Sequence, residues 1–148
     1  MTKSPTTPAH TTLAELLAFP AERCEQMLRA ALERYADGDF HQAETILVGL
    51  ITLNNGDARP LKLLASTCLH QGRHAQAESL YERALELDPD DAYTLVALGE
   101  IKLKALKIEE AVPLFERLFA LDADGNSPPA NRGRELVRDY HQRFADKG

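Results

Sequence analysis

The chain has 148 residues, of which 44% are hydrophobic and 27% are charged, and its formal net charge is -6. These values indicate a globular domain with a sizeable core and exclude a disordered chain. The negative charge argues against a nucleic-acid-binding protein, because such a protein needs a basic face to neutralise phosphates.

The N-terminal part of the sequence predicts a short helix after an irregular start. Residues 1–10 are rich in Thr and Pro, and we expect them to be disordered. Thr12 and Glu15 have the spacing of a capping box, and Pro20 ends or restarts the helix. Such a helix is too short to be stable alone, so its apolar stripe must pack on the following residues or on a second copy. We predict a dimer interface that consists of Leu13, Leu16, Leu17 and Phe19.

Capping residues and helix breakers then predict the remaining helices. The first two span about 22–36 and 41–53, and Asp57 caps the next, with Pro60 tolerated in its first turn. The segment Asp88–Asp91 ends one helix and caps the next. Pro113 lies inside the last repeat helix and predicts that this helix starts late or bends slightly. Ser127 caps a terminal helix that runs to about Phe144.

A 34-residue period organises these helices. Small and large apolar residues recur around three alanines, Ala43, Ala77 and Ala111. Small residues stand twelve positions before each alanine, and large ones four positions after it. The small set is Ala31, Ala65 and Gly99, and the large set is Leu47, Tyr81 and Phe115. Small facing residues let two antiparallel helices approach closely, so each period predicts a helical hairpin. The alternative is an ordinary six-helix bundle with a coincidental period.

This pattern resembles the tetratricopeptide repeat over about residues 24–125, and its middle copy is the strongest. The resemblance implies an all-α, right-handed solenoid of three helical hairpins with an N-terminal helix and a C-terminal capping helix. We predict one helical repeat domain over 11–148. Its parts are an N-terminal helix within 11–23, repeats over 24–57, 58–91 and 92–125, and a capping helix over 127–146. Leu106 departs from the pattern, because it replaces the glycine of the turn.

The resemblance also implies a concave groove lined by the first helix of each hairpin, which we call helix A. The predicted peptide-binding residues are Leu28, Leu32, Tyr35, Lys62, Ser66, Leu69, Tyr93, Val96, Glu100 and Leu103. Most of these side chains are apolar, so the groove favours an extended peptide with apolar anchors. The charged clamp that some repeat proteins use for chaperone tails is missing. Glu78, by contrast, is expected to point outward and to contribute nothing.

The residues indicate no catalytic centre, and we predict a protein that is not an enzyme and has no cofactor. His70 and His74 are close in sequence, but Gly72 lies in the turn between them and spoils the geometry of a metal pair. Cys24 and Cys68 are expected to be buried or half-buried apolar groups rather than a disulfide. The sequence contains no secretory or membrane-spanning apolar stretch, which predicts a cytoplasmic protein.

A narrower resemblance follows from the layout as a whole. The chain looks like the tetratricopeptide chaperones of type III secretion translocator proteins, with a terminal amphipathic helix. The matching residues are Gly38, Phe40, Ala43, Gly72, Ala77, Tyr81, Ala97 and Glu100. This family implies a cytoplasmic secretion chaperone that binds an extended client segment in the groove and dimerises through its N-terminal helices. The alternative is a general assembly scaffold or adaptor in a bacterial multiprotein complex.

Overall fold

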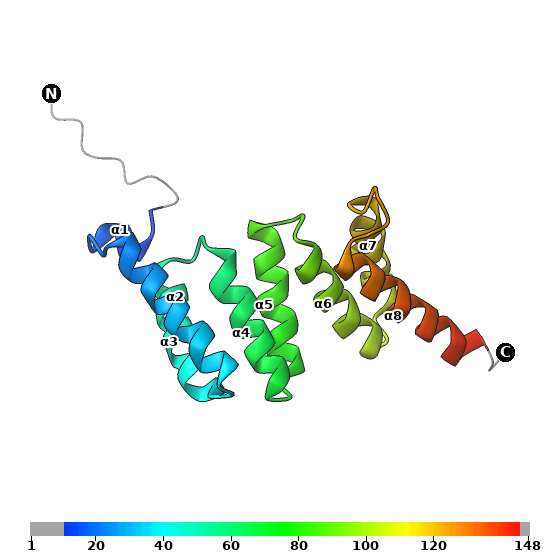
Figure 1. Ribbon diagram of the computed structural model, residues 1–148, viewed down its shortest axis with the longest axis horizontal. Helices are drawn as coiled ribbons and strands as arrows, with labels where there is room; N and C mark the ends of the chain where they lie inside the picture. The colour runs from blue at the N-terminus through cyan, green and yellow to red at the C-terminus, as the bar shows by residue number, and fades with distance from the viewer. Residues whose placement is uncertain (1–10, 146–148) are drawn as a thin grey trace, which may run out of the picture. The chain divides into compact units, whose positions relative to one another are not determined.

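The computed structural model describes residues 11–145, which form helices α1 to α8 joined by short loops and contain no strand (Figure 1). The predicted disorder of residues 1–10 lies outside this range. Contacts between Cα atoms divide the chain into two compact units, of which the first ends at Arg73 and the second begins at His74. The single repeat domain predicted over 11–148 stays a prediction.

The first unit contains four helices, and polar caps set where three of them begin. They are α1 (Leu13–Leu16), α2 (Ala21–Ala36), α3 (Phe40–Leu53) and α4 (Ala58–His70). The predicted capping box is present in α1, because the Thr12 hydroxyl accepts from the Glu15 backbone N–H and the Glu15 carboxylate accepts from that of Thr12. Asp57 caps α4 as predicted. Pro20 is the N-cap residue of α2, so it restarts the chain as a new helix.

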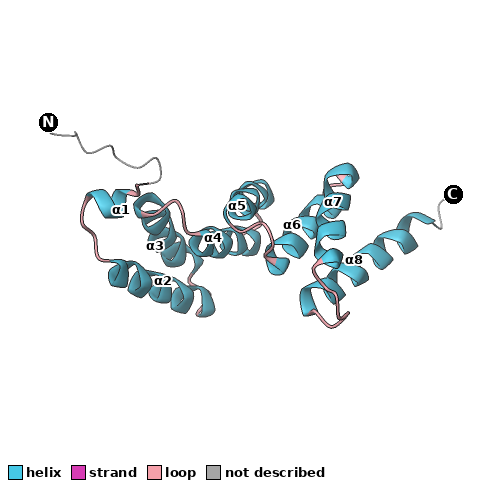
Figure 2. Ribbon diagram, turned by 90° about the horizontal axis from the view of Figure 1, so that it is seen from above, coloured by secondary structure: helices cyan, strands magenta, loops and turns pink. Residues whose placement is uncertain are grey.

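Helices α2 and α3 form the hairpin of the first unit, with small residues where they meet. Ala31 and Ala43 are completely buried, and so is the large Leu47 one turn further along α3. Helix α4 packs chiefly on α3 and only slightly on α2, while α1 lies beside α3 (Figure 2). Only Ala14 of α1 is buried among its four residues, so the leucines of this helix remain exposed.

The second unit also contains four helices. They are α5 (His74–Leu87), α6 (Ala92–Lys104), α7 (Ile108–Ala120) and α8 (Pro128–Ala145). Its core joins α6, α7 and α8 through Leu95, Phe115, Leu118 and Ala130. Gly99 allows the close approach of α6 and α7, because a Cβ atom there would lie 2.8 Å from the Phe115 ring. The repeated pattern of small and large residues therefore acts as predicted in both units.

Three turns at the 34-residue spacing have the same conformation. Gly38, Gly72 and Leu106 all have positive φ angles, of 77°, 74° and 60°. After each of them, the next backbone N–H bonds to the carbonyl five residues earlier, as in a Schellman motif. The replacement of the third glycine by Leu106 thus leaves the shape of the turn unchanged, and it places a branched side chain in a left-handed conformation.

The predictions for the last two helices, from Pro113 and from the Ser127 cap, have different outcomes. Helix α7 does not start late, because it begins at Ile108 and continues through Pro113 in its second turn. The missing N–H of Pro113 removes a single helical bond, which the buried face of α7 offsets. Helix α8 begins after Ser127, whose hydroxyl accepts from the Ala130 backbone N–H at 3.5 Å, and runs to Ala145. None of the helices within residues 11–145 is both long and apolar enough to span a membrane.

Candidate peptide-binding surfaces

The predicted binding residues of α2 differ sharply in exposure. Leu28 is buried, Tyr35 is half-buried, and Leu32 is 49% exposed. Leu28 therefore contributes mainly to the packing of the first unit and has little surface for a ligand. Leu32 is the large apolar side chain that this helix presents to solvent.

Tyr35 and Ser66 come together on neighbouring helices. The Tyr35 hydroxyl lies 2.7 Å from the Ser66 hydroxyl and 2.9 Å from Nε2 of His70. The Phe40 ring stacks on the His70 ring, with centroids 5.0 Å apart, and meets Tyr35 edge to face. These contacts fix the Tyr35 ring before any ligand binds, which lowers the entropy that binding would cost. The contact of His70 with Tyr35 was not predicted, because in the sequence His70 stands out only as a possible metal ligand beside His74.

A charged cluster joins the starts of α2 and α4, whereas Tyr35, Ser66 and His70 lie near the ends of these helices. Arg59 forms ion pairs with Glu25 at 2.5 Å and with Asp57 at 2.7 Å. Hydrogen bonds from Arg59 lower the pKa of Glu25. Burial alone would raise the pKa of Asp57, but its hydrogen bonds with Arg59 outweigh this and lower it. Lys62 and Leu69, the other predicted residues of α4, are half-buried.

In the second unit the predicted residues all lie on α6, and they have different surroundings. Tyr93 is 67% exposed, whereas Val96 belongs to the buried core. Glu100 is half-buried and forms ion pairs with Arg132 of α8 at 3.1 Å and with Lys104 at 3.0 Å. Leu103 packs against the core. Tyr93 is thus the predicted residue of this helix with the most surface for a ligand.

A buried lysine connects α6 to its neighbours in the second unit. The side chain of Lys102 is 5% exposed, and its Nζ atom lies 2.6 Å from Glu78, 2.7 Å from Glu82 and 3.4 Å from Glu110. Burial alone would lower the pKa of Lys102, but its hydrogen bonds to Glu78 and Glu82 outweigh this and raise it. The expectation that Glu78 points outward is wrong, because this carboxylate binds both Lys102 and Lys107. A sequence period could not reveal these contacts between helices.

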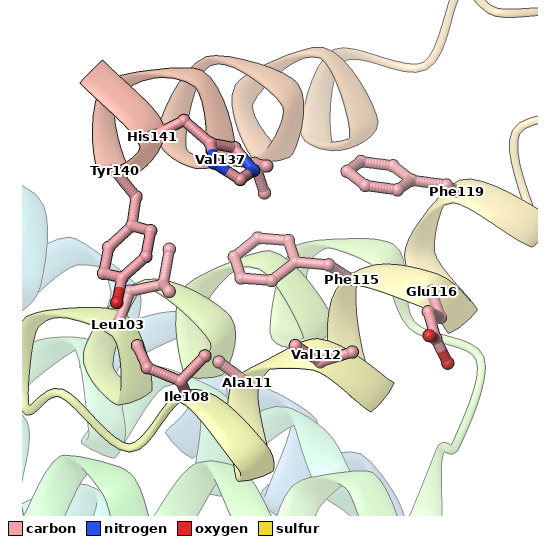
Figure 3. Close-up of a pocket in the computed structure, with 10 residues that line it drawn as sticks. All are labelled: Leu103, Ile108, Ala111, Val112, Phe115, Glu116, Phe119, Val137, Tyr140 and His141. Carbon is pink, nitrogen blue, oxygen red and sulfur yellow. The ribbon is translucent and has the colours of Figure 1, made fainter. Parts of the chain in front are cut away.

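An apolar cleft of about 270 Å³ lies between α7 and α8, and we call it the α7–α8 cleft (Figure 3). Its lining residues include one of the predicted binding residues, Leu103. They are Leu103, Ile108, Ala111, Val112, Phe115, Glu116, Phe119, Val137, Tyr140 and His141. Figure 3 shows the Tyr140 ring reaching from α8 toward Leu103 and Ile108, with Phe115 between the two helices. The sequence indicated only that α8 is amphipathic, so the cleft was missed as a site.

Neither a metal cluster nor a disulfide is present in the described part of the chain. No three His, Cys, Asp or Glu side chains within residues 11–145 gather in a geometry that could hold a metal ion. Cys24 is half-buried and Cys68 is buried, and both are free thiols. Burial raises the pKa of the Cys68 thiol, which disfavours the reactive thiolate.

Sequence comparison identifies the family. The tetratricopeptide repeat family model matches residues 34–98 and 69–131, which together cover more than half of the chain. The chain belongs to the tetratricopeptide repeat family. A comparison with curated proteins found no significant match.

Solved structures share this fold over most of their length. A T3SS complex from Aeromonas hydrophila contains a chain with 20% identity and a TM-score of 0.82, covering 90% of this chain and 91% of that one. The translocator chaperone SycD of Yersinia enterocolitica has 20% identity and a TM-score of 0.75, covering 87% and 98%. SycD also has a structure described as an alternative dimer.

A third match is PcrH, a protein of Pseudomonas aeruginosa, in complex with the chaperone binding region of PopD. It has 21% identity and a TM-score of 0.75, and the alignment covers 84% of this chain and 96% of PcrH. The chain thus resembles type III secretion translocator chaperones in fold.

Proposed function

We propose that this chain is a non-enzymatic protein-binding module, a cytoplasmic secretion chaperone that holds an extended apolar client segment on the surfaces of its A helices. The observation that carries the proposal is the pair of exposed apolar side chains Leu32 and Tyr93, on α2 and α6, in a fold shared with PcrH bound to a PopD region. Apolar groups that remain exposed on a folded surface are typical of interaction sites.

The surface of the first unit suits a peptide with apolar anchors. Leu32 offers an apolar contact, the fixed ring of Tyr35 offers a rigid aromatic one, and Leu69 on α4 adds partly exposed apolar area. Aromatic side chains bury large areas at small entropic cost, so they often dominate binding energy. Lys62 and Ser66 would add polar contacts that position the peptide backbone.

In the second unit, Tyr93 would act as the principal anchor on α6. Glu100 is held by Arg132 and Lys104, so a client that used this carboxylate would have to compete with two existing ion pairs. We therefore assign Glu100 a weaker contribution than Tyr93. The buried Leu28 and Val96 would support the two surfaces from below.

Helix α1 suits self-association. Leu13, Leu16 and Leu17 are exposed, although Ala14 is buried, so contact with α3 leaves the leucines of this helix uncovered. We propose that they pack on a second copy together with the half-buried Phe19, and the SycD dimer supports this proposal. Removal of residues 1–19 should then lower the mass measured by light scattering. An unchanged monomeric mass before and after the deletion would contradict the dimer.

The test of client binding begins with affinity purification of the tagged protein from its native host, followed by mass spectrometry. The captured client is then divided into overlapping synthetic peptides. We expect one short apolar segment to retain the affinity, which a scaffold that recognises folded subunits would not show. Replacement of Tyr35 by Ala should weaken this peptide by about 1 to 3 kcal/mol.

Two control variants distinguish the contact that the Tyr35 ring makes with the client from the positioning of that ring by its hydroxyl group. Tyr35→Phe keeps the ring but removes the hydroxyl that meets Ser66 and His70, so it should weaken binding less than Tyr35→Ala. Glu33→Ala changes an exposed residue of the same helix and should have no effect. Full affinity in Tyr35→Ala would exclude this surface as the client site.

A further inference from the structure

The α7–α8 cleft arises from the way in which α8 crosses α7. At Gly133 the two helices are so close that a Cβ atom would lie 2.7 Å from Leu118 and 3.2 Å from Phe119. Helix α8 nevertheless packs more on α6 than on α7. The first part of α8 therefore touches the end of α7, and the α7–α8 cleft remains between the start of α7 and the later part of α8 (Figure 3).

The α7–α8 cleft has the size and chemistry of a binding site for side chains of a partner protein. Its volume of about 270 Å³ lies below the usual range of about 300 to 1,000 Å³ for small-molecule sites. Nearly all its lining is apolar, and its lining residue Val112 is exposed, as is Phe144, whose ring packs on that of Tyr140. The space thus fits one or two large apolar side chains of a polypeptide better than a complete cofactor.

The charges at the rim indicate what accompanies those side chains. Glu109 and Glu116 lie on the same side of α7 as Val112, because three and four residues separate them from it along the helix. Both are exposed, and neither has an ion-pair partner among residues 11–145. In contrast, Glu100, Glu110 and Asp122 of the same unit are all paired. The two carboxylates of Glu109 and Glu116 are therefore available to pair with basic residues of a partner protein.

We propose that the α7–α8 cleft binds an amphipathic helix of a partner protein, with large apolar residues at positions i and i+4 and Lys or Arg beside them. The two apolar side chains of the partner helix enter the cleft, and its basic residues form ion pairs with Glu109 and Glu116. The stretch of α7 from Ile108 to Phe119 is about 16 Å long, which matches roughly three turns of a helix. A helix laid into a groove between two helices is a common mode of recognition. None of Leu32, Tyr35 and Tyr93, on which the client surface is proposed, lines this cleft.

A synthetic peptide of about 14 residues provides the probe. It has Leu and Phe four residues apart with Lys on one flank, and a matched peptide has Glu in place of each Lys. We expect the Lys peptide to bind the full-length protein on the order of tenfold more tightly at low salt, as measured by fluorescence anisotropy. Amide shifts in the NMR spectrum should concentrate in α7 and α8. Equal affinity of the two peptides, or shifts confined to other helices, would overturn the proposal.

Matched variants locate the site. Val112→Arg and Glu116→Lys should each weaken the Lys peptide on the order of tenfold, while circular dichroism stays unchanged because both residues are exposed. Val48→Arg is the control, since Val48 of α3 has nearly the same exposure, 49% against 46% for Val112. Comparable loss in Val48→Arg would overturn the assignment. The proposal would also be overturned if the protein bound no peptide but self-associated, and if Val112→Arg abolished this self-association. The occupant of the cleft would then be a second copy of the chain.

Discussion

Each unit contains a helical hairpin, α2 with α3 in the first unit and α6 with α7 in the second. The two hairpins have the same kind of contact between their helices, but the helix that follows packs on a different member of each. Both have small residues where the helices meet, Ala31 and Ala43 in one and Gly99 and Ala111 in the other. The helix that follows packs chiefly on the second helix of the hairpin in the first unit, but chiefly on the first helix in the second unit. The repeat pattern thus determines the hairpin, and the next helix determines which surface remains open.

The two units also hold their charges differently. In the first unit Arg73 pairs with Glu44 at 2.7 Å, and both side chains are partly exposed. In the second unit Lys102 is almost fully buried among carboxylates of α5 and α7. A buried charge that loses its partner costs far more than an exposed one, so the two units should respond differently to the loss of a cation.

The largest expected effect is the loss of Lys102. Lys102→Ala leaves Glu78 half-buried with only Lys107 as its partner, and it should lower the free energy of unfolding by about 3 kcal/mol. Arg73→Ala in the first unit should cost much less, because Arg73 and Glu44 are both partly exposed to water. Urea unfolding followed by circular dichroism measures both values. Equal losses in the two variants would remove the contrast between the units.

Acid should weaken the same cluster to a smaller extent. Hydrogen bonds from Lys102, and then from Lys107, lower the pKa of Glu78 below its usual 4.5. Its stabilising contribution is therefore complete above about pH 4.5 and is lost as the pH falls through the lowered value. Glu78→Gln should flatten the fall of stability below this pH relative to the wild type. An unchanged slope would show that Glu78 has the same proton affinity in the folded and unfolded chains.

A pair of glycines gives an effect of opposite sign in the two units. Gly133→Ala should destabilise the second unit by about 1 to 2 kcal/mol, because the new methyl group would overlap with the fully buried Leu118. Gly49→Ala in α3 of the first unit should stabilise by about 0.5 to 1 kcal/mol, since only Met27 lies nearby, at 3.9 Å. Thermal melts of the two variants should move in opposite directions. A Gly133→Ala protein that melts at the same temperature as the wild type, or at a higher one, would refute the close crossing of α7 and α8.

The smallest expected effect concerns the equivalent turns after α2 and α6. Leu106→Gly should stabilise by about 0.5 to 1 kcal/mol, because it relieves the left-handed conformation of a branched residue. Gly38→Ala should cost about 1 kcal/mol for the same reason, although nothing lies within 4 Å of the added atom. Chemical denaturation resolves both changes. A destabilised Leu106→Gly protein would mean that the exposed leucine contributes more through contacts than it costs in strain.

Most of the fold could be predicted from local signals. The capping box of Thr12 and Glu15, the Asp57 cap and the small residues at Ala31, Ala43 and Gly99 each depend on a few neighbouring or periodic positions. The late start that Pro113 suggested for α7 was wrong, because a single lost hydrogen bond counts less than the apolar face of α7, whereas the suggested bend stays a prediction. Leu106 has the left-handed conformation of the glycines in the other two turns, so the hydrogen bonds of the turn outweigh the local preference of a branched residue.

The proposed binding surfaces could be predicted only in part. Their helices followed from the period, and Leu32 and Tyr93 are exposed as a ligand contact requires. The hydrogen bonds of Tyr35 with His70, the ion pairs of Lys102 and the α7–α8 cleft depend on which helices meet and at what distance. Such contacts between helices leave no periodic trace in one sequence, so a structure is needed to find them.

The most direct test of client binding on the A helices compares two double variants in calorimetric titrations with the captured client peptide. Leu32→Ala with Tyr93→Ala removes one exposed apolar side chain from an A helix in each unit. Val48→Ala with Leu87→Ala removes one from a B helix, the second helix of a hairpin, in each unit, where these residues are 49% and 43% exposed. We expect the first variant to weaken binding on the order of 100-fold and the second by less than about twofold. Equal affinity in the first variant and the wild type, or a larger loss in the second, would contradict the assignment of the client to the A helices.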